Sequence, residues 1–272
     1  MRIADLDRLI AAGKSAVRVE IIETSGSTPR EIGAIMIVSS DNTFGTIGGG
    51  ALEFRATEQA QRMLENGAAA AETMELPLGP EIGQCCGGRV VLSLGPGGRM
   101  MLENERRRLK RQHEKEPTVL IFGGGHVGIA LARAFALLPF QTSIVETRQD
   151  ILPADLPVTH EITPLPEQAA RSAPPGAAIV VMTHDHALDY LIVSEALKRT
   201  DLAYIGLIGS KTKRATFERQ WRRDGGAAEA MDRLICPIGG GDVDDKRPEI
   251  IAAMTAAEMM KRLLGRDRSQ PS

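Results

Sequence analysis

The chain has 272 residues, of which 43% are hydrophobic and 25% charged, and its formal net charge is -2 at pH 7. This composition is typical of a folded globular protein with two modest domains, and the slightly acidic balance argues against a general nucleic-acid binder, which is usually basic. Aromatic residues make up only 3% of the chain, which also weakens a role in stacking single-stranded nucleic acid.

The cysteines and the amino-terminal residues indicate the compartment. Three cysteines, two of them adjacent, do not make a disulfide framework. The first ten residues carry charges and no apolar core, so they do not resemble a signal peptide. No apolar run approaches the roughly 20 residues that a membrane helix needs. We therefore expect a cytoplasmic protein that does not bind a membrane.

Residues 1–98 predict a small α+β domain. Short β-branched runs alternate with polar turns, and one stretch after three glycines has its apolar residues at helical spacing. We expect four strands, at 17–22, 35–38, 44–47 and 90–94, and one helix from about 51 to 66.

Two adjacent thiols lie in a glycine-rich loop just before the last of these strands. Cys85 and Cys86 are followed by Gly87, Gly88 and Arg89. Accessible backbone N–H groups and a nearby cation favour the thiolate, and a thiolate suits a sulfur-rich metal centre. We expect one active thiol and one buried thiol here. A purely structural role for both stays open, whereas a structural zinc site is disfavoured because no second cysteine pair is present.

Residues 99–116 form a charge-rich segment for which we expect a helix. Its simplest interpretation is a solvated linker between two domains, and a surface that docks a partner is the alternative.

Pro117 ends the segment, and residues 117–265 then alternate between apolar strands and helices, followed by a polar tail at 266–272. This alternation predicts a Rossmann-like parallel sheet with helices on both faces. The strands are expected at 118–122, 142–146, 178–182 and 204–208, and the helices at 127–138, 188–198, 211–222 and 249–263.

A G-x-G-x-x-G loop joins the first strand and helix of this second domain. Gly123 would allow the tight turn, Gly125 would let a phosphate approach the backbone, and Gly128 would let the helix pack closely. The free N–H groups at the helix start would hold an anion. Glu146 stands where a Rossmann domain places its ribose-binding acid. His126 either faces solvent or points at the ligand, and a loop that binds no dinucleotide is the alternative.

Further polar clusters follow the later strands. His184, with His186 and Asp189, follows a buried strand, and these side chains would either bind a metal or a proton, or make ordinary hydrogen bonds while Asp185 caps the helix. Ser210 can cap the next helix. Basic residues at a helix start oppose the helix dipole, so a bound anion would explain Lys211, Lys213 and Arg214. A third glycine loop follows Cys236.

Taken together, these motifs resemble the XdhC/CoxI family of molybdenum-enzyme accessory proteins. The resemblance spans nearly the whole chain, in the family's order. The matching segments are 24–30, 45–53, 84–89, 123–128, 183–189, 204–211 and 237–239. One departure follows the last segment, where the family usually has Leu-Asp-Ile-Gly-Ala and this chain reads Gly240-Gly241-Asp242-Val243-Asp244-Asp245-Lys246.

The resemblance implies a non-catalytic function. It implies that the chain binds molybdenum cofactor, protects it during sulfuration and delivers it to a xanthine dehydrogenase-type apoenzyme, with a cysteine desulfurase as a second partner and a homo-oligomer, often a dimer, as the assembly. Cys85 and Cys86 would be the metal-contacting residues. The residues expected to bind the cofactor are Cys85, Cys86, Gly87, Arg89, Gly123, Gly125, His126, Gly128, Glu146, His184, Ser210 and Lys211.

Three alternatives remain at this point. An NAD(P)-dependent oxidoreductase would explain the glycine loop and Glu146, but not the two thiols. A metal-dependent enzyme would use His184, His186 and Asp189. A scaffold between desulfurase and dehydrogenase would bind no ligand of its own.

Overall fold

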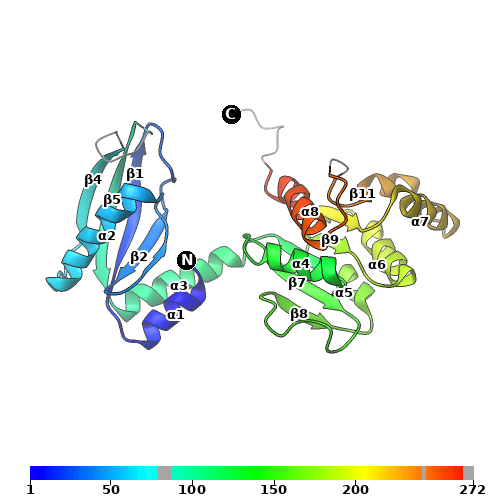
Figure 1. Cartoon of the computed structure of the whole chain (residues 1–272), viewed down its shortest axis with the longest axis horizontal. Helices are drawn as coiled ribbons and strands as arrows, with labels where there is room; N and C mark the ends of the chain where they lie inside the picture. The colour runs from blue at the N-terminus through cyan, green and yellow to red at the C-terminus, as the bar shows by residue number, and fades with distance from the viewer. Residues whose placement is uncertain (79–86, 241–242, 266–272) are drawn as a thin grey trace. The chain divides into compact units, whose positions relative to one another are not determined.

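The structure is a computed structural model that describes residues 1–78, 87–240 and 243–265. The chain divides into two compact units, here called unit 1 (Met1–Gln112) and unit 2, which begins at His113. Each unit is described by itself, with the labels of Figure 1. Within the described ranges, no helix is both long and apolar enough to cross a membrane.

Unit 1 is built on a five-stranded antiparallel sheet with the order β3-β2-β1-β5-β4. Alternate residues of each strand point to opposite faces, and each face is covered by helices. Met36 and Val38 pack with helix α2, whereas Ile35 and Ile37 pack with Leu6 and Leu102 of α1 and α3. The elements are α1 (Ile3–Ala11), β1 (Ala16–Ser25), β2 (Ile35–Ser39), β3 (Thr43–Gly45), α2 (Gly50–Glu65), β4 (Glu72–Leu78), β5 (Gly88–Gly97) and α3 (Arg99–His113).

Two elements of unit 1 were not expected from the sequence, namely α1 and β4. The charged segment at 99–116 is helical as expected, but it does more than link two domains. Leu102 of α3 is completely buried against α1 and the sheet, and Glu105 is 3% exposed. The helix is therefore part of the core of unit 1.

Unit 2 is a six-stranded parallel sheet with the order β11-β10-β9-β6-β7-β8. Val119 and Ile121 of β6 pack against α4 and α8, and Leu120 and Phe122 pack on the other face against α5, α6 and α7. This confirms the predicted Rossmann-like sheet between two helical layers. The elements are β6 (Thr118–Phe122), α4 (His126–Phe135), β7 (Gln141–Glu146), β8 (Thr159–Ile162), α5 (Pro166–Ser172), β9 (Ala178–Val181), α6 (His186–Lys198), β10 (Tyr204–Leu207), α7 (Lys211–Arg223), η2 (Ala228–Arg233), β11 (Leu234–Ile235) and α8 (Pro248–Leu263).

The strand order determines where a ligand can enter. Counted from β8, the strands of unit 2 follow the chain order third, second, first, fourth, fifth, sixth. The strands that follow β6 are added on one side of the sheet, and those that follow β9 are added on the other side. In open α/β sheets, ligands bind in the crevice at the carboxyl ends of the two strands where this change of direction occurs. The glycine loop leaves β6 at this point, and the segment containing His184 leaves β9 beside it.

Candidate functional site

Two glycines shape the turn between β6 and α4. Gly123 has a φ of 113°, and a side chain there would overlap the carbonyl oxygen of Met182 on β9's loop. A Cβ at Gly128 would overlap the carbonyl oxygen of Gly123, so α4 lies directly on the strand end. These are the tight turn and the close helix packing that the motif predicts for its first and third glycines.

The start of α4 is open. Gly125 is the N-cap residue, no side chain caps the helix, and its first turn contains no acidic residue. A Cβ added at Gly125 would meet no atom within 4 Å, and His126 is exposed. Unpaired N–H groups and the helix dipole together make such an end attractive to an anion.

Glu146 holds the glycine loop from the neighbouring strand. It is 3% exposed at the end of β7, and its Oε2 accepts hydrogen bonds from the N–H of Gly124 at 2.7 Å and from Arg148 Nη2 at 2.8 Å. Its Oε1 accepts from the N–H groups of Thr147 and Arg148 and from Arg148 Nε, at 2.8–3.1 Å. Burial alone would raise the pKa of Glu146, but the hydrogen bonds from Arg148 and the backbone outweigh it and lower the pKa from 4.5 to about 2.

These bonds leave Glu146 little capacity for a ligand. A carboxylate offers about four acceptor positions, and the groups of its own chain occupy both oxygens. The side chain of Leu152 closes the same region, because its Cδ2 would lie only 2.5 Å from a Cβ at Gly124. Glu146 therefore acts as an internal anchor of the loop in this structure, and the hydroxyl groups of a ribose would have to displace Arg148.

A buried ion pair connects the ends of β9 and β10. Asp189, which is 1% exposed, accepts from the N–H and the hydroxyl of Thr183 at 3.1 and 2.7 Å. Its other oxygen accepts from Lys213 Nζ at 2.6 Å, and Lys213 also donates to the carbonyl of Ile208 at 2.9 Å. The stem of Lys213 crosses directly over Gly209, where a Cβ would lie 2.5 Å from Lys213 Cδ.

The basic turn at the start of α7 is thus only partly available to an anion. Lys213 is paired with Asp189, and Arg214 donates to the backbone carbonyls of Met231 and Leu234. Lys211 stays exposed, and Ser210 caps the helix as predicted, accepting from the N–H of Lys213 at 3.2 Å. Of the three basic residues, Lys211 is the one left for a ligand at this turn. The sequence pattern gave no signal that Lys213 would turn inward.

The histidines after β9 lie at the surface. His184 and His186 are both exposed, and His186 Nδ1 is 3.8 Å from Asp189 Oδ2. Asp185 caps α6 by accepting from the N–H of Ala187 at 2.7 Å. Among the described residues, no three side chains of histidine, cysteine, aspartate or glutamate gather in a way that could hold a metal ion.

The third glycine loop follows β11. Cys236 is buried there, and burial raises the pKa of its thiol. The N–H of Gly240 donates to Glu258 Oε2 at 2.9 Å, and the hydroxyl of Tyr204 donates to Glu258 Oε1 at 2.6 Å. The segment in which this chain departs from the family pattern includes residues 241 and 242, which lie outside the described residues.

In unit 1, the glycine-rich segments meet one another. A Cβ at Gly48 would lie 2.5 Å from Pro29 Cγ, and one at Gly26 would lie 3.1 Å from Gly88 Cα. Gly87 forms a bridge with Ser27 and has a φ of 56°. The three segments at 24–30, 45–53 and 87–89 therefore form one cluster.

Three of the predicted cofactor contacts, Cys85, Cys86 and Arg89, belong to the sequence around this cluster. Cys85 and Cys86 lie outside the described residues. Arg89 lies on β5 and pairs with Glu75 at 2.8 Å and with Glu23. Its guanidinium charge is therefore shared between two carboxylates.

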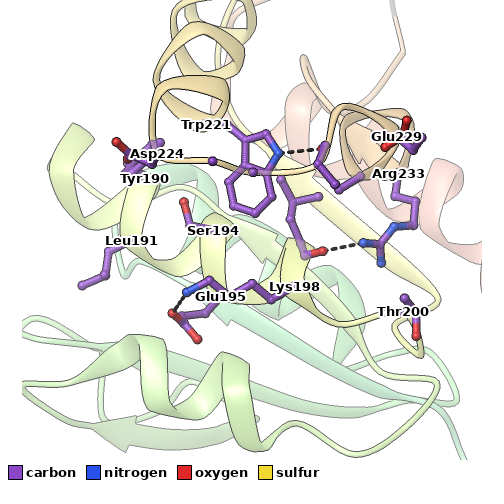
Figure 2. Close-up of a pocket in the computed structure, with 15 residues that line it drawn as sticks. Tyr190, Leu191, Ser194, Glu195, Lys198, Thr200, Trp221, Asp224, Glu229 and Arg233 are labelled. Atoms are coloured by element: carbon purple, nitrogen blue, oxygen red, sulfur yellow. Dashed lines mark hydrogen bonds and ion pairs between the residues drawn. The ribbon is translucent and has the colours of Figure 1, made fainter.

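A cavity of about 690 Å³ lies away from these residues, between α6, the end of α7 and η2 (Figure 2). Lys198 pairs with Glu195, and Trp221 and Arg233 donate to backbone carbonyls. None of the residues predicted from the sequence lines this cavity.

The candidate site is therefore the carboxyl edge of the parallel sheet, where Gly125, His126, His184, Ser210 and Lys211 follow three neighbouring strands.

Comparisons with known proteins match both units. Residues 119–259 match the XdhC Rossmann domain, and residues 9–75 match the XdhC and CoxI family. The Escherichia coli (strain K12) protein YqeB, described as uncharacterized, is 26% identical over 263 residues. That alignment covers 89% of this chain and 42% of YqeB, so the chain spans about two fifths of the length of this curated relative.

A solved structure shares the fold. It is described as a xanthine dehydrogenase from Bacillus halodurans, and it matches with a TM-score of 0.78 at 21% sequence identity. The match covers 99% of this chain and 98% of the other. Because the Rossmann-domain match alone spans more than half of the 272 residues, the chain belongs to the XdhC and CoxI family.

Proposed function

We propose that this chain is an accessory protein of a xanthine dehydrogenase-type enzyme, which binds molybdenum cofactor, protects it during sulfuration and delivers it to the enzyme. Membership of the XdhC and CoxI family supports the accessory role. The observation that carries the ligand part of the proposal is the open amino end of α4, at the sheet edge where α/β folds bind ligands.

The residues present fit a phosphate-bearing pterin. The cofactor supplies a metal centre on a dithiolene, a pterin ring and a phosphate. The N–H groups after Gly125 and the cation of Lys211 would hold the phosphate, and the exposed polar side chains of His126, His184 and Ser210 offer hydrogen bonds to the pterin. The pair of thiols in a glycine-rich loop of the sequence supports a thiolate of Cys85 or Cys86 as the contact to the metal.

A dinucleotide fits this edge less well. In a Rossmann enzyme the acid after the second strand binds the ribose, whereas Glu146 here accepts hydrogen bonds from Gly124, Thr147 and Arg148. Leu152 fills the space beside it. These contacts favour a carrier over an NAD(P)-dependent oxidoreductase.

The remaining parts of the proposal follow the family resemblance. They are a homo-oligomeric assembly and a cysteine desulfurase as a second partner. The cytoplasmic location is proposed from the cysteines and the charged amino-terminal residues of the sequence. No turnover is required of the chain, because a carrier needs different affinities for its ligand in different states rather than a stabilised transition state.

The test compares two substitutions to aspartate. In Gly125→Asp the new side chain enters open space at an N-cap position, where aspartate is a favoured residue, so folding is preserved. The new carboxylate occupies the N–H groups of α4 and repels a phosphate. Gly98→Asp is the control, since it adds the same charge in equally open space just before α3. The purified proteins are incubated with released molybdenum cofactor and desalted, and retained molybdenum and oxidised pterin are measured.

We expect near-stoichiometric retention by the unmodified chain and by Gly98→Asp, and a loss of at least about tenfold in Gly125→Asp. Equal retention by all three proteins would place the cofactor elsewhere. If no protein retains pterin, while NADH or NADPH fluorescence shifts on titration, the oxidoreductase alternative replaces the carrier. The Cys85→Ala, Cys86→Ala double variant then tests whether the thiols contribute to retention.

A further inference from the structure

The charge of the molecule is unevenly distributed along the chain. Residues 99–111, which make up most of α3, contain six arginine or lysine residues and two glutamates. That segment therefore carries a net charge of +4, whereas the whole chain carries -2, so the other residues together carry -6. A cationic strip on an otherwise acidic protein creates a local field that can orient a partner.

Half of these cations have carboxylate partners. Arg99 pairs with Glu103, Arg106 with Asp7, and Arg108 with Glu105. The other three are Arg107, Lys110 and Arg111, and within the described part of the chain none of them has a carboxylate within 4 Å. All three are exposed. They lie on one side of the helix, because positions three and four residues apart are neighbours, and they are called the α3 basic face below.

A groove of about 610 Å³ runs beside this face and is lined by Arg18, Met100, Arg108 and Arg111. Glu105 also lines the groove and is 3% exposed. It accepts from Arg108 Nε at 2.8 Å and from Arg18 Nε at 3.4 Å, and Arg18 Nη1 donates to Glu20 at 2.7 Å.

These contacts fix two guanidinium groups without using all of their donors. Arg18 Nη2 and Arg108 Nη1 have no acceptor among the described residues. A guanidinium that is already held in place loses less freedom when it binds a carboxylate. Met100, which is 75% exposed, adds an adaptable apolar contact at the rim.

We propose that the α3 basic face and its groove dock an acidic segment of a protein partner, with glutamate or aspartate carboxylates on the arginines and a small apolar side chain against Met100. A nucleic acid is the less suitable occupant, because the groove has no aromatic lining residue and the rest of the chain repels a phosphate backbone. This proposal is independent of the cofactor site in unit 2.

The test measures the binding of a fluorescein-labelled peptide of six glutamates and two leucines to the full chain, by fluorescence anisotropy at low salt. The variant is the pair Arg107→Gln and Arg111→Gln. The matched control is the pair Arg219→Gln and Arg223→Gln, which removes the same charge at the same spacing from exposed positions of α7. Neither control arginine pairs with a carboxylate among the described residues, so folding is expected to be unaffected in both variants.

We expect the first pair to weaken peptide binding about tenfold and the control pair to weaken it less than twofold. Binding should also weaken between about 0.02 and 0.15 M salt. An equal loss in both variants would show a diffuse charge effect and would overturn the proposal, as would a lack of binding by the unmodified chain. Tighter binding of a labelled single-stranded uridine oligonucleotide, lost in the first pair alone, would identify a nucleic-acid surface instead.

Discussion

Two glycine-rich loops precede helices in this molecule, and they differ in how the helix start is neutralised. The loop at 48–50 leads into α2, and Glu53 in the first turn of that helix accepts from Thr46, Ile47 and Gly49. The loop at 123–128 leads into α4, whose first turn contains no acidic residue. The first loop is closed by its own helix, whereas the second is anchored by Glu146 from a neighbouring strand.

This difference shows what a glycine motif does and does not indicate. Both loops use glycine for close backbone packing, as Gly48 does against Pro29 and Gly128 does against Gly123. Whether the positive end of the helix dipole is neutralised depends on which element supplies the carboxylate. A carboxylate in the helix's own first turn offsets the positive end of the dipole, while one that binds only the preceding loop leaves that end available for a ligand.

The largest effect is expected from Glu146→Gln. A pKa lowered from 4.5 to about 2 corresponds to about 3 kcal/mol of stability. Because the pKa is lower in the folded state, this stability is present above about pH 4.5 and is lost as the pH falls toward 2. The difference in unfolding free energy between the unmodified chain and the variant should therefore shrink over that range. Trp221, the only tryptophan, is buried in unit 2 and reports its unfolding. A pH-independent difference would contradict the anchoring role.

A smaller loss of stability should distinguish Gly128, which is needed for close packing, from Gly125, which lies in open space. Gly128→Ala adds a single methyl group that overlaps a backbone carbonyl, and we expect it to destabilise unit 2 by about 1–3 kcal/mol. Gly125→Ser adds more atoms, but in open space at an N-cap position, and should change stability by less than about 0.5 kcal/mol. Urea unfolding followed by Trp221 fluorescence checks both. Similar losses in the two variants would mean that the space around Gly125 is filled.

The smaller of the two effects expected from removing a loop carboxylate concerns Glu53. Burial alone would raise its pKa, but hydrogen bonds from Thr46 and the backbone lower it, so the group is a carboxylate at neutral pH. Glu53→Gln should lower the unfolding free energy of unit 1 by about 1 kcal/mol, measured by hydrogen exchange.

Inorganic phosphate should shift the amide resonances at the start of α4 in the unmodified chain, and those at the start of α2 only in Glu53→Gln. Shifts at α2 in the unmodified chain would remove the contrast between the loops.

Much of the fold could be predicted from the sequence. The strand at 118–122 was placed at its observed ends, because buried parallel strands are short apolar runs bounded by glycine. The helices α4, α6, α7 and α8 were placed within a few residues, whereas the short helix α5 was not predicted. β8 was missed because all four of its residues are exposed at the sheet edge and show no alternation. α1 was missed because only three of its nine residues are buried, one of them the polar Asp5.

The candidate site was predictable in outline but not in its contacts. The glycine spacing indicates a turn, and that part of the motif depends on backbone sterics alone. The pairing of Glu146 with Arg148, and of Asp189 with Lys213, depends on how side chains from different strands meet. Both pairs change which groups remain available for a ligand.

The inward orientation of Glu146 has a consequence for how a glycine motif with a downstream acid is interpreted. An acid that would bind a ribose in a dinucleotide enzyme occurs here at the same place in the fold, yet the hydrogen bonds that it accepts come from groups of its own chain. For a ribose to bind Glu146, the side chains of Arg148 and Leu152 would have to move aside, and each movement would loosen the loop before the ligand compensated for it. A glycine motif with a downstream acid therefore indicates the turn of a Rossmann-like domain, whereas nucleotide binding also depends on whether the acid is free of partners within its own chain.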